Sequence, residues 1–336
     1  MIQYIVILLD DTSTSFCHYT NGKTVRRLMP LATLKEGIRY AMKENLNIQF
    51  VYPAYSLPQE YLEVIDSIDH TDIKPFVNNE ASLPGINEEN VVSNDANVVV
   101  FNSLKETYGC QFGSATAYVV RTDKASLFNG YKDIAAILAK TTRLNVVITD
   151  ITTFTDDDDV SYKSLLSQLS KEVERLYVIG KSPQLNLLTD RMMLDKMNNC
   201  GAGDTTITLA PDGCFYVCPA FYVSADGYAV GSLEHGLDIK NPQLYRLDHA
   251  PICRNCDAWQ CRRCVWLNRL TTYEVNTPSH EQCVVAHLER NASSNLLSSI
   301  RKHGTFLPGK EDFKETEYLD PFDKRAIGEM YKQLNI

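Results

Sequence analysis

Short apolar runs alternate with longer amphipathic stretches over the first 195 residues. The apolar runs are rich in β-branched residues and predict strands at Tyr4–Leu9, Ile48–Tyr52, Asn97–Phe101 and Asn145–Ile148. The amphipathic stretches predict helices at Leu31–Asn45, Gln59–Ile68, Ala125–Lys140 and Tyr162–Tyr177. Strands that alternate with helices are typical of βα units, so we expect an α/β fold with a parallel sheet or a partial βα barrel.

The pattern changes at Cys200, from where short strands and turns follow one another. Thr205–Leu209, a Pro-Asp-Gly turn at residues 211–213 and Cys214–Val217 predict a hairpin. The predicted helices of this half are Glu281–Ser299 and Lys324–Leu334. Two polar segments predict loops: Asn78–Asp95, and Asp156–Asp159, whose carboxylates are either solvated or bind a divalent ion.

Length and charge narrow the class of protein. A chain of 336 residues has room for about two domains, and we expect a βα domain over 1–195, a cysteine-rich α+β domain over 196–300 and an extension over 301–336. The net charge of −9 provides no overall basic surface for nucleic acid. No apolar run approaches the ~20 residues of a membrane-spanning helix. Because the start also lacks the basic leader of a signal peptide, we expect no membrane contact and a cytoplasmic location.

Eight of the ten cysteines lie between residues 200 and 283. In a reducing cytosol, such crowding favours metal ligation over the alternative of an exported, disulfide-bonded domain. Cysteines two residues apart, such as Cys253 and Cys256, can bind one metal from a tight turn. Zinc knuckles and iron–sulfur loops share this spacing, so the spacing alone leaves both metals open.

Seven of these cysteines follow a longer pattern. Cys200 is followed by twelve residues, Gly213, four residues and Cys218; then come Cys253-x2-Cys256-x4-Cys261-x2-Cys264 and, last, Cys283. This string resembles the SPASM domain, an auxiliary-cluster region of radical S-adenosylmethionine enzymes that modify peptides, with one residue missing from each of two spacers. The resemblance implies two 4Fe–4S clusters. It assigns Cys200, Cys218 and Cys264 to the first cluster, and Cys253, Cys256, Cys261 and Cys283 to the second.

Cys214 is left over by that pattern. At ~3.3 Å per residue along a strand it would lie about 13 Å from Cys218, so we expect a free thiol and a first cluster whose fourth iron is open or otherwise ligated. Trp259 and Trp266 are expected to pack over the metal core, and His280 is not expected to be a ligand. Four arginines among the ligands either offset the negative charge of a cluster or are solvated: Arg254, Arg262, Arg263 and Arg269.

The first half lacks the motif that such enzymes use for their cofactor. They carry C-x3-C-x2-C after the first strand, whereas the matching register here is Ser13, Cys17 and Thr20, with Tyr19 in the customary aromatic place. A hydroxyl is a poor substitute for a thiolate on iron. The second strand leads into Pro53–Pro58 in place of Gly-Gly-Glu-Pro, which contacts S-adenosylmethionine in those enzymes. We therefore expect a degenerate site that does not cleave S-adenosylmethionine; a chance cysteine in a loop is the alternative.

A SPASM-like second half without the radical motif resembles the CXXX repeat peptide maturase family, which the segment from Cys261 to Trp266 also suggests. The resemblance implies an accessory iron–sulfur protein for maturation of a ribosomally synthesised cysteine-repeat peptide. Its expected partners are that precursor peptide and a radical S-adenosylmethionine enzyme, for which it relays electrons or docks the substrate. Two alternatives stay open, a zinc-stabilised structural or adaptor module and an independent redox enzyme.

Overall fold

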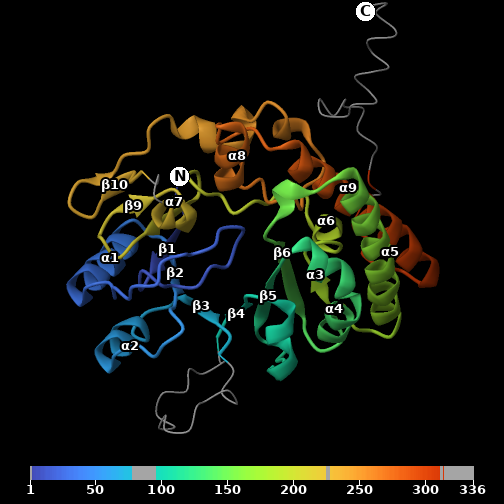
Figure 1. Cartoon of the computed structure of the whole chain (residues 1–336), viewed down its shortest axis with the longest axis horizontal. Helices are drawn as coiled ribbons and strands as arrows, with labels where there is room; N and C mark the ends of the chain where they lie inside the picture. Colours follow the sequence, from blue (N-terminus) through green and yellow to red (C-terminus); the bar gives the residue numbers. More distant parts are fainter. Residues whose placement is uncertain (1, 78–95, 225–227, 311–312, 314–336) are drawn as a thin grey trace, which may run out of the picture.

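The computed structural model describes residues 2–77, 96–224, 228–310 and 313. The loop predicted at Asn78–Asp95 and the helix predicted at Lys324–Leu334 lie outside the described residues. Figure 1 shows a broad sheet with helices along one face and the cysteine-rich segment, drawn in yellow to orange, arching over the strands towards α9.

One sheet carries most of the fold. Its strands are β1 (Tyr4–Leu8), β2 (Asn47–Val51), β3 (Thr71–Pro75), β4 (Val98–Phe101), β5 (Ala117–Thr122), β6 (Arg143–Ile148), β7 (Gln184–Leu185), β8 (Thr206–Leu209) and β9 (Phe215–Tyr216). They lie in the order β7-β6-β5-β4-β3-β2-β1-β8-β9. All neighbours are parallel except β8 and β9, and the consecutive order from β1 to β6 is that of a partial βα barrel. The predicted α/β fold is confirmed.

Helices cover the outer face of this sheet. They are α1 (Leu31–Lys43), α2 (Gln59–Ile65), α3 (Lys124–Asn129), α4 (Tyr131–Leu138), α5 (Asp156–Val178) and α6 (Asp190–Met193). The second half adds α7 (Pro219–Val223), α8 (Val265–Thr272), α9 (His280–Ile300) and a small two-stranded sheet, β10 (Gly231–Ser232) with β11 (Gly236–Leu237). Helix α9 runs beside α5, so the second half packs directly on the first (Figure 1).

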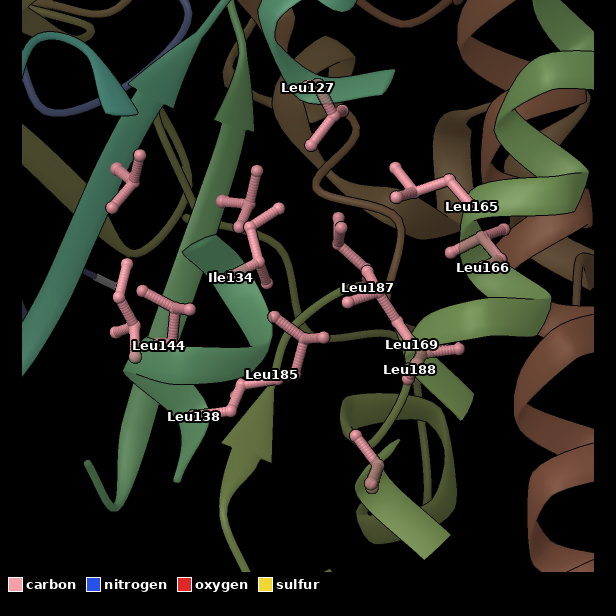
Figure 2. Close-up of a cluster of buried hydrophobic side chains, with 14 of the residues drawn as sticks. Leu127, Ile134, Leu138, Leu144, Leu165, Leu166, Leu169, Leu185, Leu187 and Leu188 are labelled. Carbon is pink, nitrogen blue, oxygen red and sulfur yellow. The ribbon is translucent and has the colours of Figure 1, made fainter. Parts of the chain in front are cut away.

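The two faces of β1 bury different side chains, as the period of two along a strand requires. Ile5 and Ile7 point outward and pack with Leu34 and Ile38 of α1. Val6 points to the inner face, where it joins one branched apolar residue from each of several neighbouring strands. Figure 2 shows the outer core further along, where Leu185 and Leu187 lie between Leu144 and the leucines of α5. Burying one such leucine stabilises the fold by about 1.5–3 kcal/mol.

Two predicted segments differ from the structure. The stretch Ala125–Lys140 is two helices, α3 and α4, that meet at Gly130, the least helix-favouring ordinary residue. The prediction of a loop at Asp156–Asp159 is wrong, because these carboxylates form the first turn of α5. The Thr155 side chain caps this helix in a capping box with Asp158, and negative charge is favourable at a helix N-terminus.

The hairpin predicted after Cys200 is present and extends the main sheet. Strand β8 pairs in parallel with β1, while β9 returns antiparallel to it. The turn ends at Gly213, whose φ of +78° favours glycine and whose N–H donates to the carbonyl of Ala210. The start of the cysteine-rich half is thus held against the first strand of the chain. The predicted division at residue 195 into separate domains stays a prediction.

Within the described parts of the chain, no helix is both long and apolar enough to cross a membrane.

Candidate metal centre

A cavity of about 720 Å³ lies on the inner face of β1, β2 and β8. Val6, Gln49 and Thr208 line its floor from these three strands. Its volume falls within the roughly 300–1,000 Å³ of small-molecule and cofactor sites. The cysteine-rich half closes the cavity from the other side, with Cys264 and Trp266 among the lining residues.

Four cysteines from separate segments line this one cavity: Cys17, Cys200, Cys218 and Cys264. Cys17 belongs to the loop after β1, and Cys200 precedes β8. Cys218 directly precedes α7 and Cys264 directly precedes α8. The structure therefore brings together the three cysteines that the resemblance assigned to a first cluster, and it adds Cys17 to them.

The thiols of this group act on one another electrostatically. Burial, and after it the nearby Cys200 thiol, raise the pKa of Cys17 to about 12, although Arg262 and Arg121 act in the opposite direction. The pKa of Cys264 is also raised to about 12, by burial first and then by Cys200. Burial and the neighbouring Cys264 likewise hold the pKa of Cys218 well above its ordinary value. Thiols that disfavour one another's charge in this way are close in space, and a bound cation would reverse the effect.

Arg263 brings positive charge to the same cavity. It is 3% exposed, and its Nη2 donates to the carbonyl of Tyr245. Its Nε and Nη1 are buried without a hydrogen-bond partner among the described residues. Since a buried guanidinium with unpaired donors is costly, the site fits an anionic group of the kind that thiolates and iron form. Four thiols and a cation thus line one cavity, and these are the kinds of group that the cluster implied by the resemblance would need.

The second predicted set of cysteines gathers beside α9. Cys253 is buried. Burial, with smaller contributions from Cys253 and Cys256, raises the pKa of Cys261 to about 12. The Cys256 Sγ lies 3.6 Å from the Nε2 of His287. Because His287 is one helical turn beyond Cys283 on α9, the two share a helix face that is turned towards this set.

The side chains of the described residues are not arranged as the ligands of a single metal ion. Among the described residues, no three His, Cys, Asp or Glu side chains are grouped as they would be around one metal ion. Cys214 is a half-buried free thiol that packs with the apolar side chains of the inner face. The expectation that Cys214 is a free thiol outside the clusters stays a prediction.

The other predicted neighbours of the ligands differ in their surroundings. Arg254 and Arg269 are exposed, so the solvated alternative holds for these two, whereas Arg262 and Arg263 line the cavity. Trp266 also lines it and packs edge-on against Phe221. Trp259 lies elsewhere, under the guanidinium of Arg191.

The loop after β1 is built differently from a three-thiolate site. The Ser13 hydroxyl is buried and forms hydrogen bonds with two backbone groups. It accepts from the N–H of Asp10 and donates to the carbonyl of Val51. The Thr20 hydroxyl accepts from Arg121. Cys17 alone among the three register positions lines the cavity. Ser13, Cys17 and Thr20 therefore have separate environments.

Arg121 of β5 fixes this loop, and sequence reasoning missed it. It is 5% exposed and donates to the carbonyls of Cys17 and Tyr19 at 3.0 and 2.6 Å. It also donates to Asn102 Oδ1 at 2.9 Å. The strand that carries it, Ala117–Thr122, was not among the predicted strands, and no local pattern indicates which groups its one cation would reach.

Tyr55 lies in the segment after β2, the position of the Gly-Gly-Glu-Pro motif in radical S-adenosylmethionine enzymes. The Tyr55 hydroxyl donates to Oδ2 of Asp10 at 2.8 Å, and Asp10 is fully buried at the end of β1. The N–H and hydroxyl of Thr12 also donate to Asp10. The carboxylate of Asp10 therefore accepts all these hydrogen bonds from Thr12 and Tyr55 of the same chain.

The comparisons with known proteins agree with this architecture. No family model matches the sequence, and no curated protein matches it. Among solved structures, hexahistidine-tagged anSMEcpe with bound AdoMet has a TM-score of 0.58 and 12% identity, covering 89% of this chain and 96% of that one. Native anSMEcpe with bound AdoMet and the Cp18Cys peptide has a TM-score of 0.58 and 10% identity, covering 90% of this chain and 99% of that one. At such identity the likeness shows the fold alone, and that fold is shared over nearly the full length of both chains.

Proposed function

We propose that this chain is an accessory iron–sulfur protein in peptide maturation, which relays electrons or docks substrate for a catalytic radical enzyme. The observation that carries the proposal is the single cavity shared by Cys200, Cys218 and Cys264, which come from three distant segments. Arg263 lines the same cavity, and its two buried nitrogens without a hydrogen-bond partner among the described residues favour an anionic occupant. An iron–sulfur cluster would supply one-electron transfer there.

The residues around the cavity have defined tasks in this proposal. Cys200, Cys218 and Cys264 would hold the first cluster, and Cys253, Cys256, Cys261 and Cys283 the second. Arg262 and Arg263 would offset negative charge and donate hydrogen bonds towards sulfur, which raises a cluster's reduction potential. Trp266 shields the wall of the cavity from water.

The separate environments of Ser13, Cys17 and Thr20 support an accessory role. A radical enzyme needs three thiolates around one cluster, and here two of these positions carry hydroxyls with partners of their own. The solved structures of similar fold hold AdoMet, one of them with a peptide. For this chain we propose a peptide partner, a cysteine-repeat precursor, without S-adenosylmethionine cleavage.

The first test is anaerobic purification with iron, sulfide and zinc quantified. We expect about eight irons and a matching amount of acid-labile sulfide per chain, from two 4Fe–4S clusters. Stoichiometric zinc without sulfide would instead support the structural zinc module. With a strong reductant and S-adenosylmethionine, 5′-deoxyadenosine should stay at the level of a control without protein.

The second test is co-expression with a radical S-adenosylmethionine enzyme and its cysteine-repeat peptide. Peptide mass should shift with the intact chain and stay unmodified with Cys218→Ala, provided that circular dichroism shows a folded variant. Cys110→Ala is the matched control, because this half-buried thiol packs against the outer core. Full peptide modification with Cys218→Ala, or without the chain, would refute the accessory role.

A further inference from the structure

The first cysteine set is one ligand short. A 4Fe–4S cluster is held by four cysteine thiolates, and the set of Cys200, Cys218 and Cys264 supplies three. The unassigned cysteines of the chain are Cys17, Cys110 and Cys214. Cys17 lines the same cavity as the three, whereas Cys110 packs beside the outer core and Cys214 beside the apolar inner face.

We propose that Cys17 is the fourth ligand of the first cluster, an inference that rests on the iron–sulfur function proposed above. In this arrangement, the loop after β1 no longer supports a cluster of its own. It gives its one thiol to the auxiliary cluster, and the first and second halves of the chain share that cluster. All four irons then have a protein ligand, which suits electron transfer and not substrate binding at an open iron.

The segment from Cys17 to Tyr19 is fixed, so the thiol is held at the cavity wall. The carbonyl of Cys17 accepts from Arg121 Nε, and the carbonyl of Tyr19 accepts from Nη2. His18 lies between them, with its Nδ1 3.0 Å from the carbonyl of Ile148 on β6. Two strands thus anchor a three-residue segment, and a positioned ligand loses little conformational entropy when it binds.

The charges around Cys17 favour the same role. Arg121 lies behind the loop, and Arg262 and Arg263 line the cavity in front of it. Four thiolates would place strong negative charge at this point, and these cations would offset it. Asn145 holds Arg262 by accepting from its Nη2 at 3.1 Å.

The test compares Cys17→Ala with Cys110→Ala, both in a Cys256→Ala background that leaves the first cluster to be observed alone. Iron and sulfide per chain are measured after anaerobic purification, and electron paramagnetic resonance identifies the cluster type. We expect Cys110→Ala to keep about four irons, and Cys17→Ala to hold a three-iron cluster or none. Four irons and an unchanged spectrum in Cys17→Ala would overturn the proposal.

Cys17→Ser provides a second measurement that does not depend on losing the cluster. Serine keeps the size of the side chain but offers oxygen to iron, so the reduction potential of the first cluster should shift from that of the parent protein. An unshifted potential would count against ligation by Cys17. If the parent protein holds zinc and no iron, the function proposed above fails; if it holds iron that the Cys17 variants leave unchanged, the ligand inference alone fails.

Discussion

A buried charge cluster beside the second cysteine set predicts a large loss of stability in Asp257→Asn. Asp257 follows Cys256, and its Oδ2 accepts from Nε and Nη2 of Arg290 at 2.8 and 2.7 Å. The Nη2 of Arg191 lies 3.6 Å from the same oxygen, and its Nε donates to the Asp257 carbonyl. The side chains of Asp257, Arg191 and Arg290 are 9%, 6% and 12% exposed. One carboxylate therefore neutralises two nearly buried cations.

The magnitude follows from that burial. Asparagine keeps the shape of the side chain but removes the negative charge that both guanidinium groups contact, and breaking a buried pair in this way costs about 3–5 kcal/mol. Asp248→Asn is the matched control, because Asp248 pairs with Arg246 at 2.9 Å while both are more than half exposed. Such exposed pairs contribute about 0.2–1 kcal/mol.

Urea unfolding under anaerobic conditions, followed by circular dichroism, measures both variants against the parent protein. Arg191 lies in α6 and Arg290 in α9, so Asp257 ties the Cys253–Cys264 segment to both halves of the chain. We therefore also expect Asp257→Asn to lose iron faster from the second site during gel filtration. Equal urea midpoints for the two variants would refute the claim that this network stabilises the segment.

The remaining predictions concern three other places. Burial raises the pKa of Glu289 to about 7, against about 4.3 in an unfolded chain, so the free energy of unfolding should fall by about 3 kcal/mol as pH rises from 4 to 7. Glu289→Gln should lack this fall, and equal pH profiles would contradict it. Gly203→Ala should destabilise the fold by about 1–3 kcal/mol more than Gly180→Ala, measured by urea titration. Both glycines have a positive φ, but a Cβ at residue 203 would lie 2.5 Å from the ring of Tyr245, whereas a Cβ at residue 180 would meet no atom within 4 Å. The double variant Ser13→Cys/Thr20→Cys should bind no additional iron, because these two side chains face different partners; four more irons per chain would show that they converge.

The βα half was predictable because its strands bury both faces. Runs such as Val98–Phe101 are apolar throughout and give a strong signal for a buried parallel strand. Strand β3 was missed because Asp72 and Lys74, which pair with each other, interrupt its apolar residues. Strand β7 has two residues, too few for any period to be visible.

The site was predictable in part, and for a different reason. The family resemblance assigned Cys200, Cys218 and Cys264 to one group, and these three line one cavity, while their role as ligands stays a prediction. The position of Cys17 depends on the path of the loop after β1, which Arg121 fixes from a strand far along the chain. Likewise, the unpaired nitrogens of Arg263 follow from burial by the opposite half, which no local pattern encodes.

Arg121 gives a physical reason why the loop after β1 can be ordered without a cluster. Three thiolates on one cluster would cross-link such a loop, and without them its buried carbonyls need other donors. The guanidinium of Arg121 meets this need by donating to two loop carbonyls and to the Thr20 hydroxyl, and these bonds in turn offset its own desolvation. The loop is thereby held in a conformation in which Cys17 lines the cavity shared with the cysteine-rich half. In the proposal made above, the same arginine contacts order a loop that lacks three thiolates and present Cys17 to the auxiliary cluster.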